Sequence, residues 1–427
     1  SVGFVVADLA SGAVLEALAA DRPFAPASVA KIPTALFAIE TLGAARRFAT
    51  VVRAEGPLAG GRLTGALALQ GGGDPELDSA ELAGLARATA RAVRALEGRF
   101  VVDAGAVAPL IDPGQRPEAS YNPAVAGLNL NYNRVQLAWR RQGRRLEAAL
   151  RAHAEGYSPE VQGIALDLAG DDCGCPPFDH VTGPQAEGWR VRAGAMQGQG
   201  SVWLPVRAPD RYAGEVFRLA AAEAGLALPA AVSGAAAGIE IARHESRPVA
   251  EIVRDMLRWS TNLTAEALGR AACAALGKPE TALAASAAVM SGWVAARAGF
   301  AADGEFSLAN HSGLDPTPTC SPRRMVAVLA AGHGTLAGLL PPRRMDDADA
   351  PAPEGAQVLA KTGTIDFGRG LAGYLDTASG RRLVFAYFAN DLDSRVEGRS
   401  RQAARVWRNR ATALERELLR SWATRFG

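Results

Sequence analysis

Ser28 and Lys31 stand at a spacing that suits nucleophilic catalysis. Both lie near the start of "SVAKIPTALFAIETLG", whose apolar residues at three- and four-residue spacing predict a helix that ends at Gly43. Residues three apart on a helix share one face, so a serine and a lysine there are within reach of each other. A serine hydroxyl attacks only after a neighbour accepts its proton, and a lysine does this when burial or a nearby cation lowers its pKa. Taken alone, such a pair is more often an N-cap serine and a surface lysine.

A second polar motif, Ser260-Thr261-Asn262, interrupts a long helical region. Two predicted helices meet there, one in "PVAEIVRDMLRW" and the other in "LTAEALGRAACAAL". Polar side chains at such a junction can face a cleft. An S-x-N triplet is a weak indication by itself.

The third motif, Lys361 to Thr364, lies on the predicted strand "QVLAKTGTI". Alternation along a strand points Lys361 and Gly363 to one side and Thr362 and Thr364 to the other. A glycine inside a strand costs stability and often marks the close approach of another backbone or a ligand. Gly363 therefore marks a candidate contact point.

Lysine is the rare basic residue of this chain. Of 46 basic residues only Lys31, Lys278 and Lys361 are lysines, and the rest are arginines. Arginine stays charged at any relevant pH, whereas a buried lysine can lose its proton and act as a base. Two of the three lysines fall in the two motifs that contain lysine, which favours a chemical role for both.

The three motifs, in this order, resemble the signature of the penicilloyl-serine transferase superfamily. The long gap between Ser28 and Ser260, together with "LQGGGDPEL", "HSGLDP" and "KTGTIDFGRGLAGYL", is similar to the class C low-molecular-mass penicillin-binding proteins. The resemblance covers essentially the whole chain. It implies a D-alanyl-D-alanine carboxypeptidase or endopeptidase, a hydrolase that works through an acyl-enzyme.

The resemblance assigns the acyl transfer to five residues: Ser28, Lys31, Ser260, Asn262 and Lys361. Ser28 would be acylated with Lys31 as its general base. Ser260 would relay a proton to the leaving amine, and Asn262 would hold the substrate amide. Lys361 would add positive potential that helps burial to lower the pKa of Lys31.

The resemblance also implies the residues that bind the substrate: Thr362, Gly363, Thr364, Ser312 and Leu314. The two threonine hydroxyls would bind the terminal carboxylate of the peptide, and the Ser312-Gly313-Leu314 segment would line the cleft. Backbone N–H groups of Ser28 and Thr364 would form the oxyanion hole.

The predicted fold class is α/β of the α+β kind. A transpeptidase and β-lactamase-like catalytic domain, with an antiparallel sheet flanked by helices, would be made from residues 1–47 and 245–427. Residues 48–144 and 206–244 would form an inserted domain, and 145–205 a second domain nested in it, both rich in β-strands. At 427 residues the chain exceeds what one core holds, because single cores stop growing near about 250–300 residues.

Composition and the resemblance together limit the partners. The net charge of +2, with both signs interspersed, leaves no footprint for nucleic acid. The expected partners are peptidoglycan peptides as substrate and β-lactam antibiotics as covalent inhibitors. The first residues, "SVGFVVADLASGAVLEAL", have no basic n-region and suggest a chain whose signal peptide has been removed, in the periplasm or otherwise outside the cytoplasm.

No cofactor or metal is expected, because the histidines show no ligand spacing and the lysine takes the role of base. Cys173 and Cys175 in "DDCGCPP" favour a disulfide or loop thiols over a zinc site, which needs more ligands. The run "QGGGD" ends without the Lys-Ser/Thr of a phosphate loop and favours a turn capped by Asp74.

The C-terminal helix has an apolar face, which favours packing on the sheet over docking at a membrane surface. The residues of this face are Trp407, Ala411, Leu414, Leu418 and Trp422.

Two other functions are compatible with the same motifs. One is a β-lactamase or esterase on the same catalytic core. The other is a non-catalytic cell-wall binding module that keeps the fold without turnover, although the intact Ser28, Lys31 and Lys361 argue against it. Labelling by a fluorescent penicillin separates them, since a peptidase releases the label slowly and a β-lactamase quickly.

Overall fold

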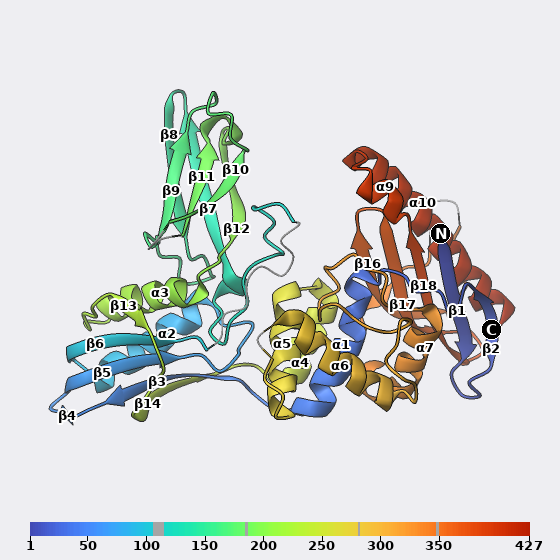
Figure 1. Ribbon diagram of the computed structural model, residues 1–427, viewed down its shortest axis with the longest axis horizontal. Helices are drawn as coiled ribbons and strands as arrows, with labels where there is room; N and C mark the ends of the chain where they lie inside the picture. The colour runs from blue at the N-terminus through green and yellow to red at the C-terminus, as the bar shows by residue number, and fades with distance from the viewer. Residues whose placement is uncertain (106–114, 184–186, 281, 347–349) are drawn as a thin grey trace. The chain divides into compact units, whose positions relative to one another are not determined.

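The chain forms two compact units (Figure 1). The structure, a computed structural model, describes these residues: 1–105, 115–183, 187–280, 282–346 and 350–427. Unit 1 consists of Ser1–Arg46 and Val249–Gly427, and unit 2 is the intervening Arg47–Pro248. The first and last parts of the sequence therefore belong to the same unit.

Unit 1 is built on an antiparallel sheet with the strand order β15-β16-β17-β18-β1-β2 (Figure 1). The strands have these bounds: β1 Val2–Asp8, β2 Val14–Leu18, β15 Pro342–Arg343, β16 Gln357–Ile365, β17 Gly368–Asp376 and β18 Arg382–Asn390. β1 pairs with β18 from Val2, opposite Ala389, to Asp8, opposite Leu383. The N-terminal hairpin thus extends the sheet that the C-terminal strands begin.

Helices cover both faces of this sheet. They have these bounds: η1 Ala27–Ala30, α1 Lys31–Leu42, α4 Val249–Trp259, α5 Asn262–Ala275, α6 Leu283–Arg297, α7 Pro322–Ala331, α8 His333–Leu336, α9 Leu392–Val396 and α10 Arg401–Arg425. On one face, η1 packs on β16 and β17, and Tyr374 of β17 donates to Leu329 O of α7. On the other face, Leu371 of β17 joins an apolar cluster with α10. The predicted antiparallel sheet flanked by helices is confirmed.

Helix α1 is largely buried within unit 1. It contacts α4, α5 and α6, and its first eight residues, from Lys31 to Ala38, are all buried. The helix ends at Leu42 because Gly43 takes φ +90°, a conformation that glycine adopts without steric cost. The end predicted at Gly43 is therefore confirmed.

The apolar face of α10 packs on the sheet, as predicted. Ala411 and Trp422 are buried in one cluster with sheet residues, and the Trp422 ring centroid lies 5.5 Å from that of Phe4. Trp407, Leu414 and Leu418 pack against the same cluster. Among the described residues, no helix combines the length and apolarity needed to cross a membrane.

Unit 2 contains a mixed sheet with the order β13-β6-β5-β3-β14, and β4 pairs with β5. Its elements have these bounds: β3 Ala49–Glu55, β4 Leu58–Ala59, β5 Arg62–Gln70, α2 Ser79–Ala92, β6 Ala95–Asp103, α3 Pro209–Glu223, β13 Ala231–Ser233 and β14 Ile239–Glu245. Helix α3 packs on this sheet, where Phe217 stacks on Phe100 at 5.6 Å between ring centroids.

Two small sheets lie within unit 2, with the orders β12-β7-β8 and β10-β11-β9. Their strands have these bounds: β7 Arg134–Gln142, β8 Arg145–Arg151, β9 Ile164–Ala169, β10 Phe178–Thr182, β11 Glu187–Arg192 and β12 Gln199–Pro205. The nested domain predicted at 145–205 starts inside the β7–β8 hairpin, where Gln142 pairs with Arg145. Because a hairpin is one hydrogen-bonded element, we propose residues 134–205 for the nested domain. For the catalytic domain and the inserted domain we propose the bounds of unit 1 and unit 2 given above.

Cys173 and Cys175 form a disulfide in the loop before β10. The sequence left a disulfide, loop thiols and a zinc site as alternatives, and the structure contains the disulfide. The described residues hold no group of three or more His, Cys, Asp or Glu side chains that could bind a metal.

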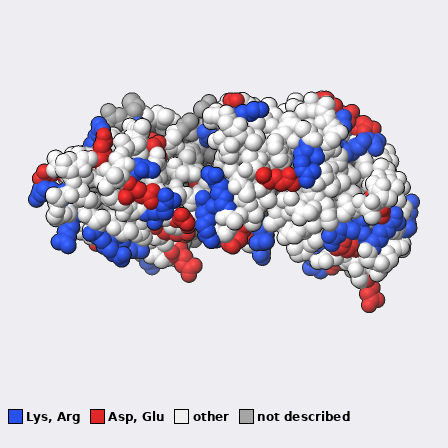
Figure 2. Space-filling view, turned by 90° about the horizontal axis from the view of Figure 1, so that it is seen from below, with Lys and Arg blue, Asp and Glu red and all other residues white. Residues whose placement is uncertain are grey.

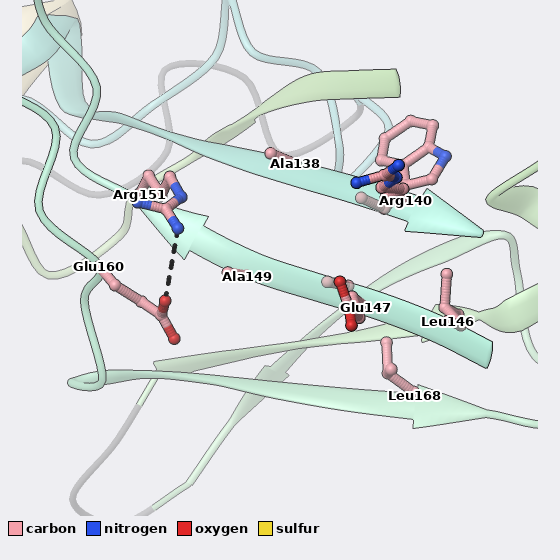
Figure 3. A pocket seen from close by; sticks show the side chains of 10 residues that line it. Ala138, Arg140, Leu146, Glu147, Ala149, Arg151, Glu160 and Leu168 are labelled. Carbon is pink, nitrogen blue, oxygen red and sulfur yellow. Dashed lines mark ion pairs between the residues drawn. The ribbon is translucent and has the colours of Figure 1, made fainter. Parts of the chain in front are cut away.

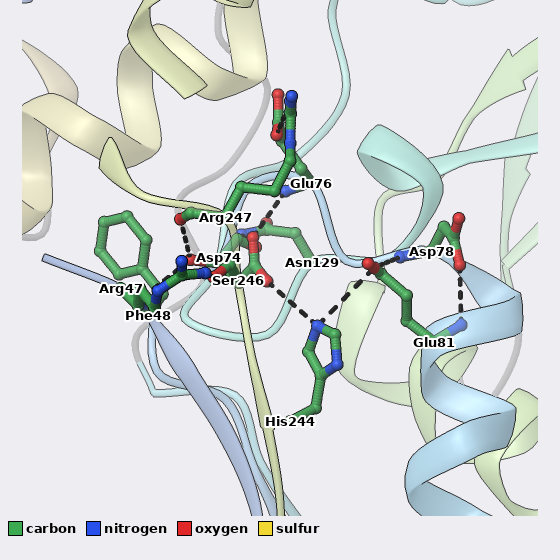
Figure 4. A network of polar contacts seen from close by, with 10 residues as sticks. All are labelled: Arg47, Phe48, Asp74, Glu76, Asp78, Glu81, Asn129, His244, Ser246 and Arg247. Carbon is green, nitrogen blue, oxygen red and sulfur yellow. Dashed lines mark hydrogen bonds and ion pairs between the residues drawn. The ribbon is translucent and has the colours of Figure 1, made fainter. Parts of the chain in front are cut away.

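A polar network joins the two ends of unit 2 (Figure 4). Phe48 N donates to Ser246 Oγ at 2.9 Å, and Ser246 N donates to Phe48 O at 2.8 Å. Asp74 caps its turn by accepting from Glu76 N at 2.9 Å, as predicted. Burial raises the pKa of the Asp74 carboxyl to about 7, and His244 Nε2 lies 3.9 Å from Asp74 Oδ2.

Charges of both signs are mixed over the surface. Figure 2 shows Lys and Arg beside Asp and Glu on the face that it draws. Arg297 Nε, for example, lies 2.8 Å from Glu40 Oε2. The surface therefore agrees with the interspersed charges of the sequence.

Candidate active site

Ser28 and Lys31 meet where η1 passes into α1. Lys31 Nζ donates to Ser28 Oγ at 2.9 Å. Ala27, just before the serine, has φ +46°, which is uncommon for a residue with a Cβ and is often found at functional sites. The turn of η1 leads directly into the first turn of α1, so the two side chains stay on one side of the chain.

The Lys31 amine is fully buried and surrounded by acceptors. Besides Ser28 Oγ, it donates to Asn262 Oδ1 at 2.8 Å and to Ser312 O at 2.7 Å. Burial lowers the pKa of Lys31 to about 7, and the negative charge of Glu266 opposes this shift. A lysine with this pKa can take up and release a proton at neutral pH.

Lys361 reaches from β16 to Ser260. Its Nζ donates to Ser260 Oγ at 3.0 Å and to Thr362 O at 2.9 Å, and the residue is 1% exposed. Burial lowers the pKa of Lys361, and the charges of Lys31, Arg343 and Arg369 lower it further. Burial is likewise the main cause of the lowered pKa of Lys31. Because repulsion between two neighbouring ammonium groups is mutual, the expected help of Lys361 in lowering the pKa of Lys31 stays a prediction.

Ser260 stands in a strained turn between α4 and α5. Its φ is +63°, and its N–H donates to Met256 O at 2.8 Å, which closes the last turn of α4. A non-glycine residue in this conformation costs of order 1–3 kcal/mol and is a frequent feature of functional sites. The chain then enters α5 at Asn262, so Ser260 faces Lys361 while Asn262 faces Lys31.

Gly363 lets β16 approach the backbone around the serine. A Cβ at Gly363 would stand 2.5 Å from Pro26 O and 3.1 Å from Ser28 N. Real Cβ atoms do not come this close to a backbone oxygen, so only glycine fits here without a shift. The close backbone approach expected at this glycine is found.

Thr362 and Thr364 lie on the other face of β16, and Thr364 is exposed. β15 pairs only with Val358 and Leu359 of β16. Within the described part of the chain, β15 therefore leaves the outer edge of Lys361–Thr364 without a strand partner. An open strand edge can bind an extended peptide through main-chain hydrogen bonds.

The Ser312 segment reaches the site through its main chain. The Ser312 carbonyl accepts from Lys31, whereas its hydroxyl accepts from Leu314 N at 3.3 Å. Gly313 has φ +74°, and a Cβ there would lie 1.8 Å from Ala27 O. Leu314 is 9% exposed. The tight turn around glycine thus brings this segment against η1.

Sequence reasoning missed Glu266. This fully buried carboxylate accepts from Ser312 N at 2.8 Å and from His311 N at 3.2 Å, and burial raises its pKa. It lies four residues after Asn262 on α5, so both side chains point from one helix face. That spacing was the indication available in the sequence.

A groove of about 570 Å³ lies elsewhere, on β7, β8 and β9 of unit 2 (Figure 3). Arg151 Nη2 lies 3.7 Å from Glu160 Oε2 on its wall. None of the motif residues lines this groove. The candidate active site is therefore the cluster around Ser28 in unit 1.

Comparisons with known proteins point to one enzyme family. The model of the D-Ala-D-Ala carboxypeptidase 3 (S13) family matches residues 1–411. Carboxypeptidase DacB of Mycolicibacterium smegmatis is 29% identical over 199 residues, which are 40% of this chain and 42% of that protein. The match thus spans less than half the length of this relative.

Solved structures share the fold over nearly the whole chain. Penicillin-binding protein 4 (dacB) of Haemophilus influenzae has a TM-score of 0.78 and 19% identity, with 98% of this chain and 96% of that chain covered. A predatory peptidoglycan endopeptidase of Bdellovibrio bacteriovorus has a TM-score of 0.51 and 15% identity, with 96% and 91% covered. At such identities the likeness concerns the fold alone.

Proposed function

The chain belongs to the D-Ala-D-Ala carboxypeptidase 3 (S13) family, and on this premise we propose that it is a serine D-alanyl-D-alanine carboxypeptidase/endopeptidase acting on peptidoglycan peptides. One observation carries the proposal: a fully buried lysine, Lys31, donates to Ser28 Oγ at 2.9 Å. Burial lowers the pKa of Lys31 to about 7, which suits a general base.

Acylation begins when neutral Lys31 accepts the Ser28 proton and Oγ attacks the carbonyl carbon of the penultimate D-alanine. The carbonyl oxygen becomes an oxyanion, which the backbone N–H groups of Ser28 and Thr364 would stabilise, a contribution typically worth about 3–4 kcal/mol. A Cβ at Gly363 would lie close to Ser28 N, so β16 and the serine are near enough for the N–H groups of Ser28 and Thr364 to bind one oxyanion together.

Ser260 relays to the leaving amine the proton that Lys31 took from Ser28: its hydroxyl gives its own hydrogen to the nitrogen and receives the proton from Lys31 in return, so Lys31 is neutral again. Because its oxygen accepts from Lys361 Nζ at 3.0 Å, its own hydrogen is free to point to the substrate. The amine of the terminal D-alanine departs as the bond to the carbonyl carbon breaks. Water then attacks the acyl-enzyme with Lys31 again as base, which releases the peptide and restores Ser28.

The substrate lies as an additional strand along the open edge of Lys361–Thr364. The hydroxyls of Thr362 and Thr364 bind its terminal carboxylate, and Asn262 holds its amide. Exposure of Thr364 and the short reach of β15 support this arrangement.

β-Lactams acylate the same serine, and the enzyme works outside the cytoplasm. The structure of Haemophilus influenzae penicillin-binding protein 4 in complex with a β-lactam, at a TM-score of 0.73, supports the first point for this fold. The peptidoglycan substrate and the Cys173–Cys175 disulfide support the second, because disulfides persist in oxidising compartments.

Ser28→Ala tests the proposal. We expect this variant to lose labelling by a fluorescent penicillin and cleavage of a D-Ala-D-Ala peptide, while its unfolding temperature stays near that of the wild type. Ser379→Ala, in the exposed β17–β18 turn, is the matched control and keeps both activities. Full labelling of Ser28→Ala would refute the nucleophile, and rapid release of label by the wild type would indicate a β-lactamase.

A further inference from the structure

Arg369 links the end of β16 to helix α10. It lies on β17 directly opposite Thr364. Its Nη1 donates to Thr364 Oγ1 at 3.2 Å, while Nε and Nη2 donate to the two carboxylate oxygens of Glu415, both at 2.7 Å. The guanidinium is therefore held in one orientation by a two-pronged contact and touches a threonine of the K-T-G-T segment.

The Arg369–Glu415 pair is buried at some cost. The side chains are 13% and 6% exposed, and Glu415 is among the buried residues of α10, with Leu419 and Trp422. Burying two ions is expensive, and apolar residues of similar size often stabilise a fold as well or better. A buried pair at this position therefore calls for a role besides stability.

The hydrogen-bond polarity gives Arg369 such a role. An arginine only donates, so Thr364 Oγ1 must be the acceptor, and its hydroxyl hydrogen points away from Arg369. Thr364 is exposed at the strand edge that β15 leaves open. The hydroxyl is thus set to donate outward, which suits an anionic acceptor such as a carboxylate.

The charges around this edge also favour an anion. Arg369 and Arg343 are both near enough to Lys361 to lower its pKa, and Arg343 Nε donates to Ala360 O at 3.1 Å. Glu415 balances one of these positive charges. Arg343 is thus a second positive charge near this end of β16, beside the Arg369–Glu415 pair.

We propose that Arg369, anchored by Glu415, is a specificity-determining residue that selects substrates with a free terminal carboxylate. It orients the Thr364 hydroxyl as a donor and adds a fixed positive charge beside it. This inference rests on the proposed function, because it concerns the same peptide or β-lactam. The alternative is a structural link that only ties α10 to β17.

The test compares acylation by benzylpenicillin, which has a free carboxylate, with acylation by its methyl ester. For Arg369→Gln we expect the second-order rate constant with benzylpenicillin to fall about 10- to 100-fold, in the range of a lost charge-assisted hydrogen bond. The rate constant with the ester should change less than about threefold. Arg369→Lys, which keeps the charge but loses the fork, should recover part of the preference.

Arg297→Gln is the matched control, since it removes an arginine that pairs with a glutamate on α1, away from the site. We expect it to change neither rate constant. Thr364→Val provides a second variant that leaves the Arg369–Glu415 pair intact, so it serves if Arg369→Gln does not fold. It should lose the same preference, and the losses of the two single variants should not add in the double variant.

The outcomes are distinct. Equal losses with the acid and the ester would show that Arg369 is only a structural link, and unchanged rate constants would show that it has no role in selection. Either result overturns the inference. If the wild type itself neither cleaves a D-Ala-D-Ala peptide nor takes up penicillin, the proposed function fails instead.

Discussion

Lys31→Arg should slow acylation of Ser28 by at least about two orders of magnitude, within the range that general-base catalysis supplies. Burial lowers the pKa of Lys31 to about 7, so about half of these side chains are neutral at neutral pH. Arginine has a pKa above about 12, and fewer than about one in 10⁵ would be neutral there. The variant keeps the positive charge beside Ser28 and loses the base.

The size of the site adds a second effect. The acceptors of Lys31, which are Ser28 Oγ, Asn262 Oδ1 and Ser312 O, lie at 2.7–2.9 Å around a fully buried amine. A guanidinium is larger than an ammonium, and overpacking of a filled site costs about 1–3 kcal/mol. The unfolding temperature of Lys31→Arg must therefore be measured, and its rates compared below that temperature.

The assay is the rate of labelling by a fluorescent penicillin between about pH 5 and pH 9. The wild-type rate should rise with pH through about 7, as Lys31 loses its proton, and Lys31→Arg should lack this rise. Lys278→Arg is the control, because Lys278 is exposed beyond the end of α5, and we expect wild-type rates from it. If Lys31→Arg labels as fast as Lys278→Arg, Lys31 is only a charge and the mechanism is wrong.

Two other substitutions test the fold around the site and in unit 2. Gly363→Ala should lower both penicillin labelling and the unfolding temperature, because its Cβ would stand 2.5 Å from Pro26 O. Gly292→Ala lies on α6, where a Cβ would meet nothing within 4 Å beyond its own helix, so labelling should stay and the unfolding temperature should not fall. Equal behaviour of the two variants would contradict the close approach. Asp74→Asn should raise the unfolding temperature at about pH 8 and leave it nearly unchanged at about pH 4. Burial raises the pKa of Asp74 from 3.8 to about 7, so the folded state retains a proton that the unfolded state loses, and stability falls as pH rises through this window. A change in unfolding temperature that is the same at both pH values would refute this reasoning.

Local patterns in the sequence predicted the parts of the site that depend on local geometry. The three-residue spacing of Ser28 and Lys31 needs only a helical turn to bring the side chains together. The alternation in Lys361–Thr364 needs only a strand, and the glycine in it indicated the close backbone approach. Each of these features involves only a few neighbouring residues, so the spacing of those residues in the sequence is enough to predict it.

The contacts that the sequence did not predict join distant segments. Glu415 meets Arg369 across 46 residues, and Glu266 meets the Ser312 backbone across the same separation. The sequence alone does not show which of its many arginines pairs with a given glutamate. It also does not show whether a glutamate is buried or exposed.

The chain leaves unit 1 and returns to it at one place, since Val249 N donates to Arg46 O at 2.8 Å. Immediately beyond this point Ser246 N donates to Phe48 O, and Phe48 N donates to Ser246 Oγ. When the two ends of an insertion are held together, its length has little effect on the stability of the domain that carries it. The reason is that loop-closure entropy grows only slowly with length. Exchange of the whole of unit 2 for a shorter connection at this turn should therefore cost unit 1 little loop-closure entropy, which makes this turn a place where the insertion can be replaced by design.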